Sequence, residues 1–77
     1  MVTAYLLMNT KPGAEVMIAE KLVSRKEVKD ITIVYGIYDL IIKLQVKNMN
    51  LLQEFILNLR KDKNIEQTAT LISTASA

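Results

Sequence analysis

The spacing of apolar residues changes from segment to segment along this chain, and the order of these changes constrains the fold more than any other feature. In Val2–Asn9 apolar residues alternate with polar ones, as they do in a half-buried strand. From Ala14 to about Arg25 they gather on one side of a helix. Two strand patterns, a second helix pattern and a last strand pattern follow, so the sequence predicts the element order βαββαβ.

Both helical segments are amphipathic and have recognisable starts. The apolar side of the first carries Ile18, Leu22 and Val23, with Val16 near its edge. The second has the clearest stripe in the chain, which consists of Leu51, Leu52, Phe55, Ile56 and Leu59. Pro12 suits the first turn of the first helix, with Thr10 or Lys11 near its cap. Asn48 or Asn50 is expected to cap the second helix.

The remaining segments read as extended chain. Ile31–Tyr35 is rich in β-branched residues, and Tyr38–Val46 alternates between apolar and polar positions. Because only a short turn at Gly36 separates these two strands, they are expected to form an antiparallel hairpin. Ile65–Thr74 is predicted to be the last strand, and Ser73–Ala77 a frayed polar tail.

The two βαβ halves, roughly 1–35 and 38–74, mirror each other. With right-handed crossovers this order predicts an α+β, ferredoxin-like domain spanning residues 1–77. Its four-stranded antiparallel sheet would carry two helices on one face and leave the other face open. Tyr5, Leu7 and Ile41 would lie on that open face, which is more apolar than a solvated face should be.

A chain of 77 residues without Cys or His lacks the usual means of stabilising a small domain. No disulfide can form, and the commonest metal ligands are absent. Since 51% of the residues are hydrophobic, association with a second copy is the remaining means, and we expect a homodimer. The alternative is a marginally stable monomer with a hydrophobic surface.

Several functional classes are disfavoured by composition. The eight acidic residues lie singly along the chain, so neither a metal site nor a cofactor is expected. The two glycines are far apart and form no phosphate loop, no serine has a recognisable base, and catalysis is not expected. Basic residues at Arg60–Lys63 are interpreted as a solvated helix end rather than a nucleic-acid patch. No membrane span or signal peptide is visible, so a cytoplasmic location is expected.

Asp39 is a lone carboxylate at the start of an otherwise apolar strand. Its simplest role is to accept hydrogen bonds from the backbone of the turn and so fix the hairpin. Gly36 in turn suits a backbone conformation with positive φ.

Two runs of residues together resemble a known family. Gly36-Ile37-Tyr38-Asp39 and the hydrophobic residues after it resemble the hairpin motif of the Lrp/AsnC effector-binding domain, also called the RAM domain. Ile65–Ile72, with Thr68 and Thr70, is similar to the final strand of that domain. The resemblance extends over the whole chain and includes the order of the elements.

This resemblance implies a regulatory function. Domains of this family dimerise through their sheet faces, dimers assemble into octamers, and an amino-acid effector binds between dimers. Asp39 would hold the ligand ammonium and the backbone near Gly36 its carboxylate. The implied ligand-binding residues are Gly36, Ile37, Tyr38, Asp39, Thr68, Thr70, Leu71 and Ile72.

Typical members of the family also carry a helix-turn-helix that binds DNA, and nothing in this sequence corresponds to it. The resemblance therefore implies a stand-alone effector domain without direct DNA binding. Such a domain would sense an amino acid in transcription regulation or amino-acid metabolism, and a full-length Lrp/AsnC regulator is a possible partner. The alternative is a structural module that co-oligomerises with such a regulator without binding a ligand itself.

Overall fold

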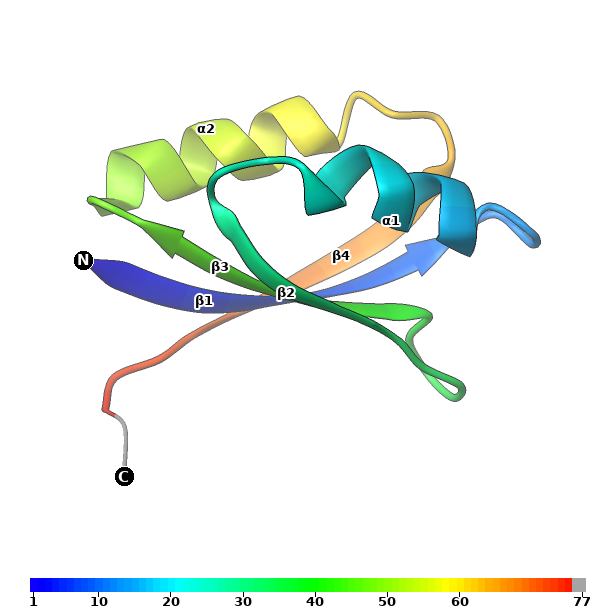
Figure 1. Cartoon of the computed structure of the whole chain (residues 1–77), viewed down its shortest axis with the longest axis horizontal. Coiled ribbons are helices and arrows are strands. Elements are labelled where there is room, and N and C mark those ends of the chain that lie inside the picture. The colour runs from blue at the N-terminus through cyan, green and yellow to red at the C-terminus, as the bar shows by residue number, and fades with distance from the viewer. Residues whose placement is uncertain (76–77) are drawn as a thin grey trace.

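The computed structural model describes residues 1–75 and contains the six predicted elements in the predicted order. They are β1 (Val2–Thr10), α1 (Glu15–Val23), β2 (Val28–Ile33), β3 (Leu40–Val46), α2 (Met49–Leu59) and β4 (Ile65–Ile72). The strands pair antiparallel in the order β2-β3-β1-β4, and both helices cover the same face of the sheet (Figure 1). The predicted ferredoxin-like fold is confirmed. The last two residues of the predicted tail lie outside the described residues.

The central strands β1 and β3 supply most of the core. Every second residue of each is buried against the helices, namely Ala4, Leu6, Met8, Leu40, Ile42, Leu44 and Val46. The helices contribute Ile18, Leu22, Leu52, Phe55 and Leu59 to the same cluster. Because burying one large apolar side chain stabilises a fold by about 1.5–3 kcal/mol, this single layer accounts for much of the stability of the domain.

The two helices start differently. The side chain of Asn48 caps α2, with its Oδ1 accepting a hydrogen bond of 2.9 Å from the Leu51 N–H, as predicted. By contrast, α1 has Ala14 at its cap position and no side-chain cap. Pro12 lies in a separate turn before the helix, so the roles predicted for Thr10, Lys11 and Pro12 are wrong. Within the described residues, neither helix is long and apolar enough to cross a membrane.

The buried side of α1 is narrower than predicted. Ile18 and Leu22 face the core, whereas Val16 and Val23 are 56% and 67% exposed. The helix has only nine residues, so two positions one turn apart are enough to cover its part of the sheet.

The hairpin of β2 and β3 is confirmed, but its loop is longer than predicted. Pairing runs from Val28 opposite Leu44 to Ile33 opposite Leu40. The connection therefore comprises residues 34–39, and the predicted strand limits Ile31–Tyr35 and Tyr38–Val46 are wrong at this end. At the opposite edge of the sheet, β4 ends at Ile72 rather than at the predicted Thr74, and its pairing with β1 ends with Ile72 opposite Ala4.

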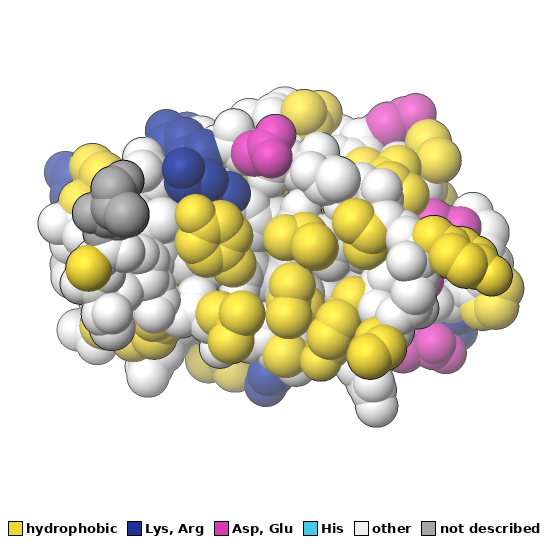
Figure 2. Space-filling view, turned by 90° about the horizontal axis from the view of Figure 1, so that it is seen from below, with side chains coloured by type: hydrophobic (Ala, Val, Ile, Leu, Met, Phe, Trp, Pro, Cys, Tyr) yellow, Lys and Arg dark blue, Asp and Glu magenta, His cyan; other side chains and the backbone are white. Residues whose placement is uncertain are grey.

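The face of the sheet without helices carries a row of apolar side chains. These are Tyr5, Leu7, Ile41, Ala69 and Leu71, which we call the open-face patch. They alternate with the buried residues of their strands, and Leu7 lies between Ile41 and Ala69 in the register. Figure 2 shows hydrophobic side chains gathered at the centre of this face. The predicted positions of Tyr5, Leu7 and Ile41 are confirmed.

Candidate ligand-binding site

The loop of residues 34–39 is the first part of the candidate site. The Val34 N–H donates a hydrogen bond of 2.9 Å to the Asp39 carbonyl oxygen and closes the loop. Gly36 has φ +146°, which confirms that this position needs a glycine conformation. The neighbouring side chains of Tyr35 and Ile37 are 104% and 86% exposed. The loop thus holds a fixed shape while presenting apolar side chains to its surroundings.

Asp39 fastens this loop to the end of β1. Its carboxylate Oδ2 accepts a hydrogen bond of 2.9 Å from the Thr10 N–H, and its own N–H donates to the Met8 carbonyl oxygen at 2.9 Å. A third hydrogen bond comes from the Asn9 side chain, whose Nδ2 donates to the Ile37 carbonyl oxygen at 2.8 Å. Asp39 does accept a hydrogen bond from the backbone, but the predicted partner is wrong, because the donor lies in β1 and not in the turn itself. The carboxylate fixes the loop to the neighbouring strand rather than fixing a tight turn.

The final strand divides the remaining predicted residues between two faces. Thr68, Thr70 and Ile72 pair with buried positions of β1 and so lie on the helix side of the sheet. Leu71 pairs with Tyr5 and lies on the opposite face, in the open-face patch. Because side chains alternate along a strand, Leu71 does not share a face with the other three.

Two hollows adjoin the start of β4. One, of about 470 Å³, is lined by Tyr38, Arg60, Ile65, Glu66, Gln67 and Thr68. The other, of about 580 Å³, is lined by Asn9, Thr10, Ile37, Asp39, Glu66 and Gln67. The two hollows share Glu66 and Gln67. Of the predicted residues, Tyr38 and Thr68 line the first hollow and Ile37 and Asp39 line the second. Gly36, Thr70, Leu71 and Ile72 line neither hollow.

Arg60 lines the first hollow, although the sequence predicted only a solvated helix end at this position. It follows the last residue of α2, and its Nε donates a hydrogen bond of 3.1 Å to the Thr68 Oγ1. Asn9, Thr10, Glu66 and Gln67 were also missed. The sequence offered one signal for Arg60: it directly follows Leu59, the last residue of the buried stripe. This places Arg60 where α2 leaves the sheet.

The charges of the site are of both signs. Arg60 supplies a cation to one hollow, Asp39 supplies an anion to the other, and Glu66 adds a carboxylate to both. Thr68 and Gln67 add a hydroxyl and an amide. Among residues 1–75 no group of three or more Asp, Glu, His or Cys side chains is arranged to hold a metal ion. The chemistry available is recognition of a small polar molecule by charges and hydrogen bonds.

Comparison with known proteins agrees with this interpretation. Residues 3–77 match the family model of the Lrp/AsnC ligand binding domain. The HTH-type transcriptional regulator FL11 of Pyrococcus furiosus is 30% identical over 71 residues, which cover 92% of this chain and 47% of the regulator. The chain thus spans about half the length of that relative.

Two solved structures are similar over nearly their full lengths. The hypothetical protein PHS023 from Pyrococcus horikoshii is 42% identical with a TM-score of 0.92, covering 99% of this chain and 93% of its own. FFRP-DM1 is 43% identical with a TM-score of 0.92, and the match covers 95% of this chain and 99% of FFRP-DM1. Since domains of this family are regulatory, the prediction that the chain is not an enzyme is confirmed. The chain belongs to the Lrp/AsnC family of transcription regulators, in which it corresponds to the ligand-binding domain.

Proposed function

We propose that this domain senses a free amino acid at the edge formed by loop 34–39 and the start of β4. The observation that carries the proposal is the placement of a cation and a carboxylate in two adjoining hollows. Arg60 lies in one, Asp39 lies in the other, and Glu66 and Gln67 connect them. A free amino acid is a zwitterion, so its recognition needs a cation for the carboxylate and an anion for the ammonium.

Each end of the ligand has a suitable partner. The planar guanidinium of Arg60, already oriented by its bond to Thr68, can bind the α-carboxylate through its remaining N–H groups. Asp39 uses Oδ2 for the Thr10 N–H, which leaves Oδ1 to accept from the ligand ammonium. Arg60 thus takes the role that the resemblance gave to the backbone near Gly36, and Gly36 itself shapes the loop.

An oligomer would complete the site. Tyr35 and Ile37 extend from the loop almost fully exposed, and exposed apolar side chains beside a polar hollow suit contact with a second subunit. In our proposal the open-face patch pairs two subunits, and loops 34–39 meet where dimers assemble into an octamer. Thr70, Leu71 and Ile72 then contribute to subunit contacts, while Ile37, Tyr38, Asp39 and Thr68 contact the ligand.

Isothermal titration of the protein with each of the twenty amino acids tests this proposal. We expect one amino acid, or a small related group, to bind. Arg60→Gln and Asp39→Asn each remove one charge and should weaken binding by about tenfold or more, because charge-assisted hydrogen bonds are lost. Lys61→Gln and Asp30→Asn are matched controls, since both residues are exposed and line neither hollow.

The controls should bind as the wild type does. Absence of binding across the panel, in a sample shown by light scattering to be assembled, would contradict the proposal. Equal losses in the site variants and the controls would mean that only the overall charge matters.

A second function is favoured by one feature of the loop. The hydrogen bonds of Asp39 and Asn9 are made within the chain, so the shape of the loop does not depend on a ligand. In this alternative the domain co-oligomerises with a full-length Lrp/AsnC regulator as a structural module. Light scattering of a mixture with such a regulator would then show mixed assemblies whose size does not change when amino acids are added.

A further inference from the structure

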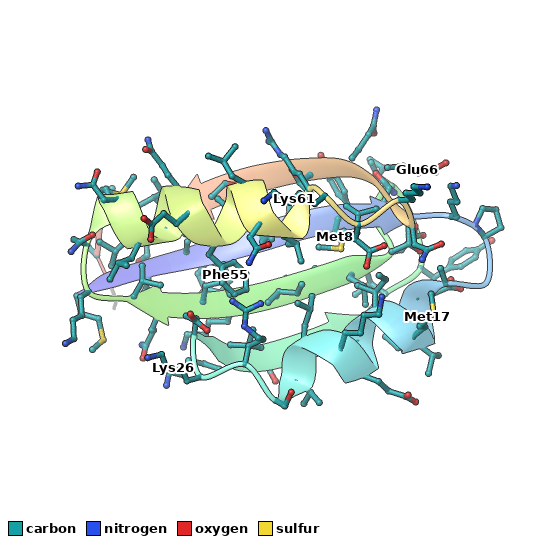
Figure 3. The ribbon with its side chains drawn as sticks, turned by 90° about the horizontal axis from the view of Figure 1, so that it is seen from above. Met8, Met17, Lys26, Phe55, Lys61 and Glu66 are labelled. Atoms are coloured by element: carbon teal, nitrogen blue, oxygen red, sulfur yellow. The ribbon has the colours of Figure 1, made fainter. Side chains whose placement is uncertain are left out.

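A third hollow lies at the end of the sheet opposite to loop 34–39. Its volume is about 560 Å³, within the range of small-molecule sites. It lies between the first residues of β2, the end of β3 and the side of α2. Figure 3 shows Lys26 near this end of the molecule and Glu66, of the site described above, at the other. The seven residues of β3 separate the two ends by roughly 20 Å, at about 3.3 Å per residue.

Four cations surround this hollow, namely Arg25, Lys26, Lys29 and Lys47, together with the two acids Glu27 and Glu54. Four positive charges minus two negative charges give +2, which equals the net charge of the whole chain. The six other basic residues are balanced by six other acidic ones. The entire excess of positive charge is therefore concentrated at one hollow, which favours an anionic ligand.

The lysines are available to such a ligand. Within the described part of the chain, the ion pairs are Lys21 with Asp62 and Arg25 with Glu27, so Lys26, Lys29 and Lys47 have no carboxylate within 4.0 Å. All three are exposed at the rim. Three unpaired ammonium groups around one concave surface suit a phosphate group, which offers several charged acceptor oxygens.

The floor of the hollow is built differently from its rim. Arg25 lies over the ring of Phe55, with its Cζ 4.8 Å from the ring centroid, so one face of the guanidinium is fixed. Its side chain remains 40% exposed. A flat ring can stack on a guanidinium held in this way.

Glu27 places a negative charge beside Arg25. Its Oε1 is buried, has no hydrogen-bond partner among the described residues and lies 3.6 Å from the Arg25 Nε. This ion pair helps to hold the guanidinium in place, while the buried oxygen itself is out of reach of a ligand in the hollow.

We propose that this hollow binds a nucleoside phosphate. The phosphate lies among Lys26, Lys29 and Lys47, and the base stacks on the guanidinium of Arg25. This site is separate from the candidate amino-acid site, and either can exist without the other.

NMR titration of the ¹⁵N-labelled protein with AMP, ribose 5-phosphate, adenosine and inorganic phosphate tests this proposal. We expect AMP to shift the amide signals of residues around the hollow. The other three compounds, each lacking part of the ligand, should bind about tenfold more weakly or worse, since each omits a charged or stacking contact. Lys29→Gln with Lys47→Gln should reduce AMP binding by at least about tenfold, because two charge-assisted contacts are lost.

Lys61→Gln with Lys63→Gln is the matched control, because it removes the same charge from exposed lysines outside the hollow. This control should keep AMP binding. No AMP-induced shifts at millimolar concentration would overturn the proposal, as would an equal loss in both double variants. Binding of a single-stranded oligonucleotide through these lysines without binding of AMP would also overturn it and would identify a nucleic-acid surface instead.

Discussion

A single carboxylate connects two segments of this chain that are 29 positions apart. Asp39 accepts a hydrogen bond from the Thr10 N–H, and Thr10 is only 5% exposed. This donor is difficult for water to reach, so the bond is important for the geometry of both segments. The position of the loop beside β1, and hence the position of the candidate site, depends on this contact.

Asp39→Ala should lower the free energy of unfolding by about 1–3 kcal/mol, because the Thr10 N–H would be left without an acceptor. Asp39→Asn should cost less, since the amide oxygen can still accept. Urea unfolding followed by circular dichroism measures both. Asp30→Ala, which removes an exposed carboxylate from β2, is the control. If Asp39→Ala were as stable as this control, the contact would have no structural importance.

Residues of the site differ in how well the sequence predicts them. The conformation of Gly36 was predicted because it is local: the position needs a positive φ. Asp39 stood out as an isolated carboxylate beside a turn, but its partner Thr10, 29 positions away, could not be predicted. Asn9, Arg60 and Glu66 were missed because they come from three different elements. Only the pairing of β1 with β4, and the exit of α2 above them, brings these three side chains close to the loop.

At the scale of elements, the spacing of apolar residues correctly predicted the order and type of the helices and strands. It did not predict where each of them begins and ends. Asn48 was a correct cap because its side chain acts on its own helix. The ends of β2 and β3 depend on which residues find partners across the hairpin, which is a property of two strands together. The cap of α1 was wrongly predicted for a similar reason, since Lys11 is held by a hydrogen bond of 2.8 Å from its N–H to the Asn64 carbonyl oxygen.

One ion pair connects α1 to the turn after α2. Lys21 Nζ lies 3.1 Å from the Asp62 Oδ2, and the Asn64 N–H donates to the Asp62 Oδ1 at 2.9 Å. The backbone hydrogen bond from Asn64, and then the bond from Lys21, lower the pKa of Asp62 below its ordinary value of 3.8. The folded protein therefore holds this carboxyl ionised at a pH where the unfolded chain begins to protonate it.

Because its folded-state pKa is depressed, Asp62 stabilises the fold above about pH 4, and this contribution disappears as the pH falls through the folded-state pKa. Asp62→Asn should therefore be less stable than the wild type at neutral pH, and the difference should shrink in acid. Urea unfolding at a series of pH values from about 6 to 2.5 measures it. Glu20→Gln, an exposed change on α1, should leave the acid dependence nearly unchanged. A constant difference between Asp62→Asn and the wild type at every pH would contradict the prediction.

For the whole molecule, the open-face patch is the feature most in need of a partner. Leu71 at its margin is 56% exposed, and Tyr5 near its centre is 37% exposed. We expect the wild type to be a dimer and Leu71→Asp to be a monomer, because pairing two such faces would bury an unpaired charge. Light scattering coupled to size-exclusion chromatography measures the mass directly.

Leu57→Asp is a suitable comparison, since Leu57 is 61% exposed on α2, away from the sheet. This variant should remain a dimer. A monomeric wild type at micromolar concentration, or identical behaviour of the two variants, would mean that the patch does not mediate association.

The central position of β1 has a consequence for how the domain would respond to its surroundings. One strand carries Tyr5 and Leu7 of the open-face patch and, at its end, the bonds to loop 34–39. If ligand and subunit both act on this strand, their binding equilibria are linked, and each changes the affinity for the other by the same factor. The apparent affinity for the effector would then depend on the concentration of the domain itself, so the protein would report its own abundance as well as that of its ligand.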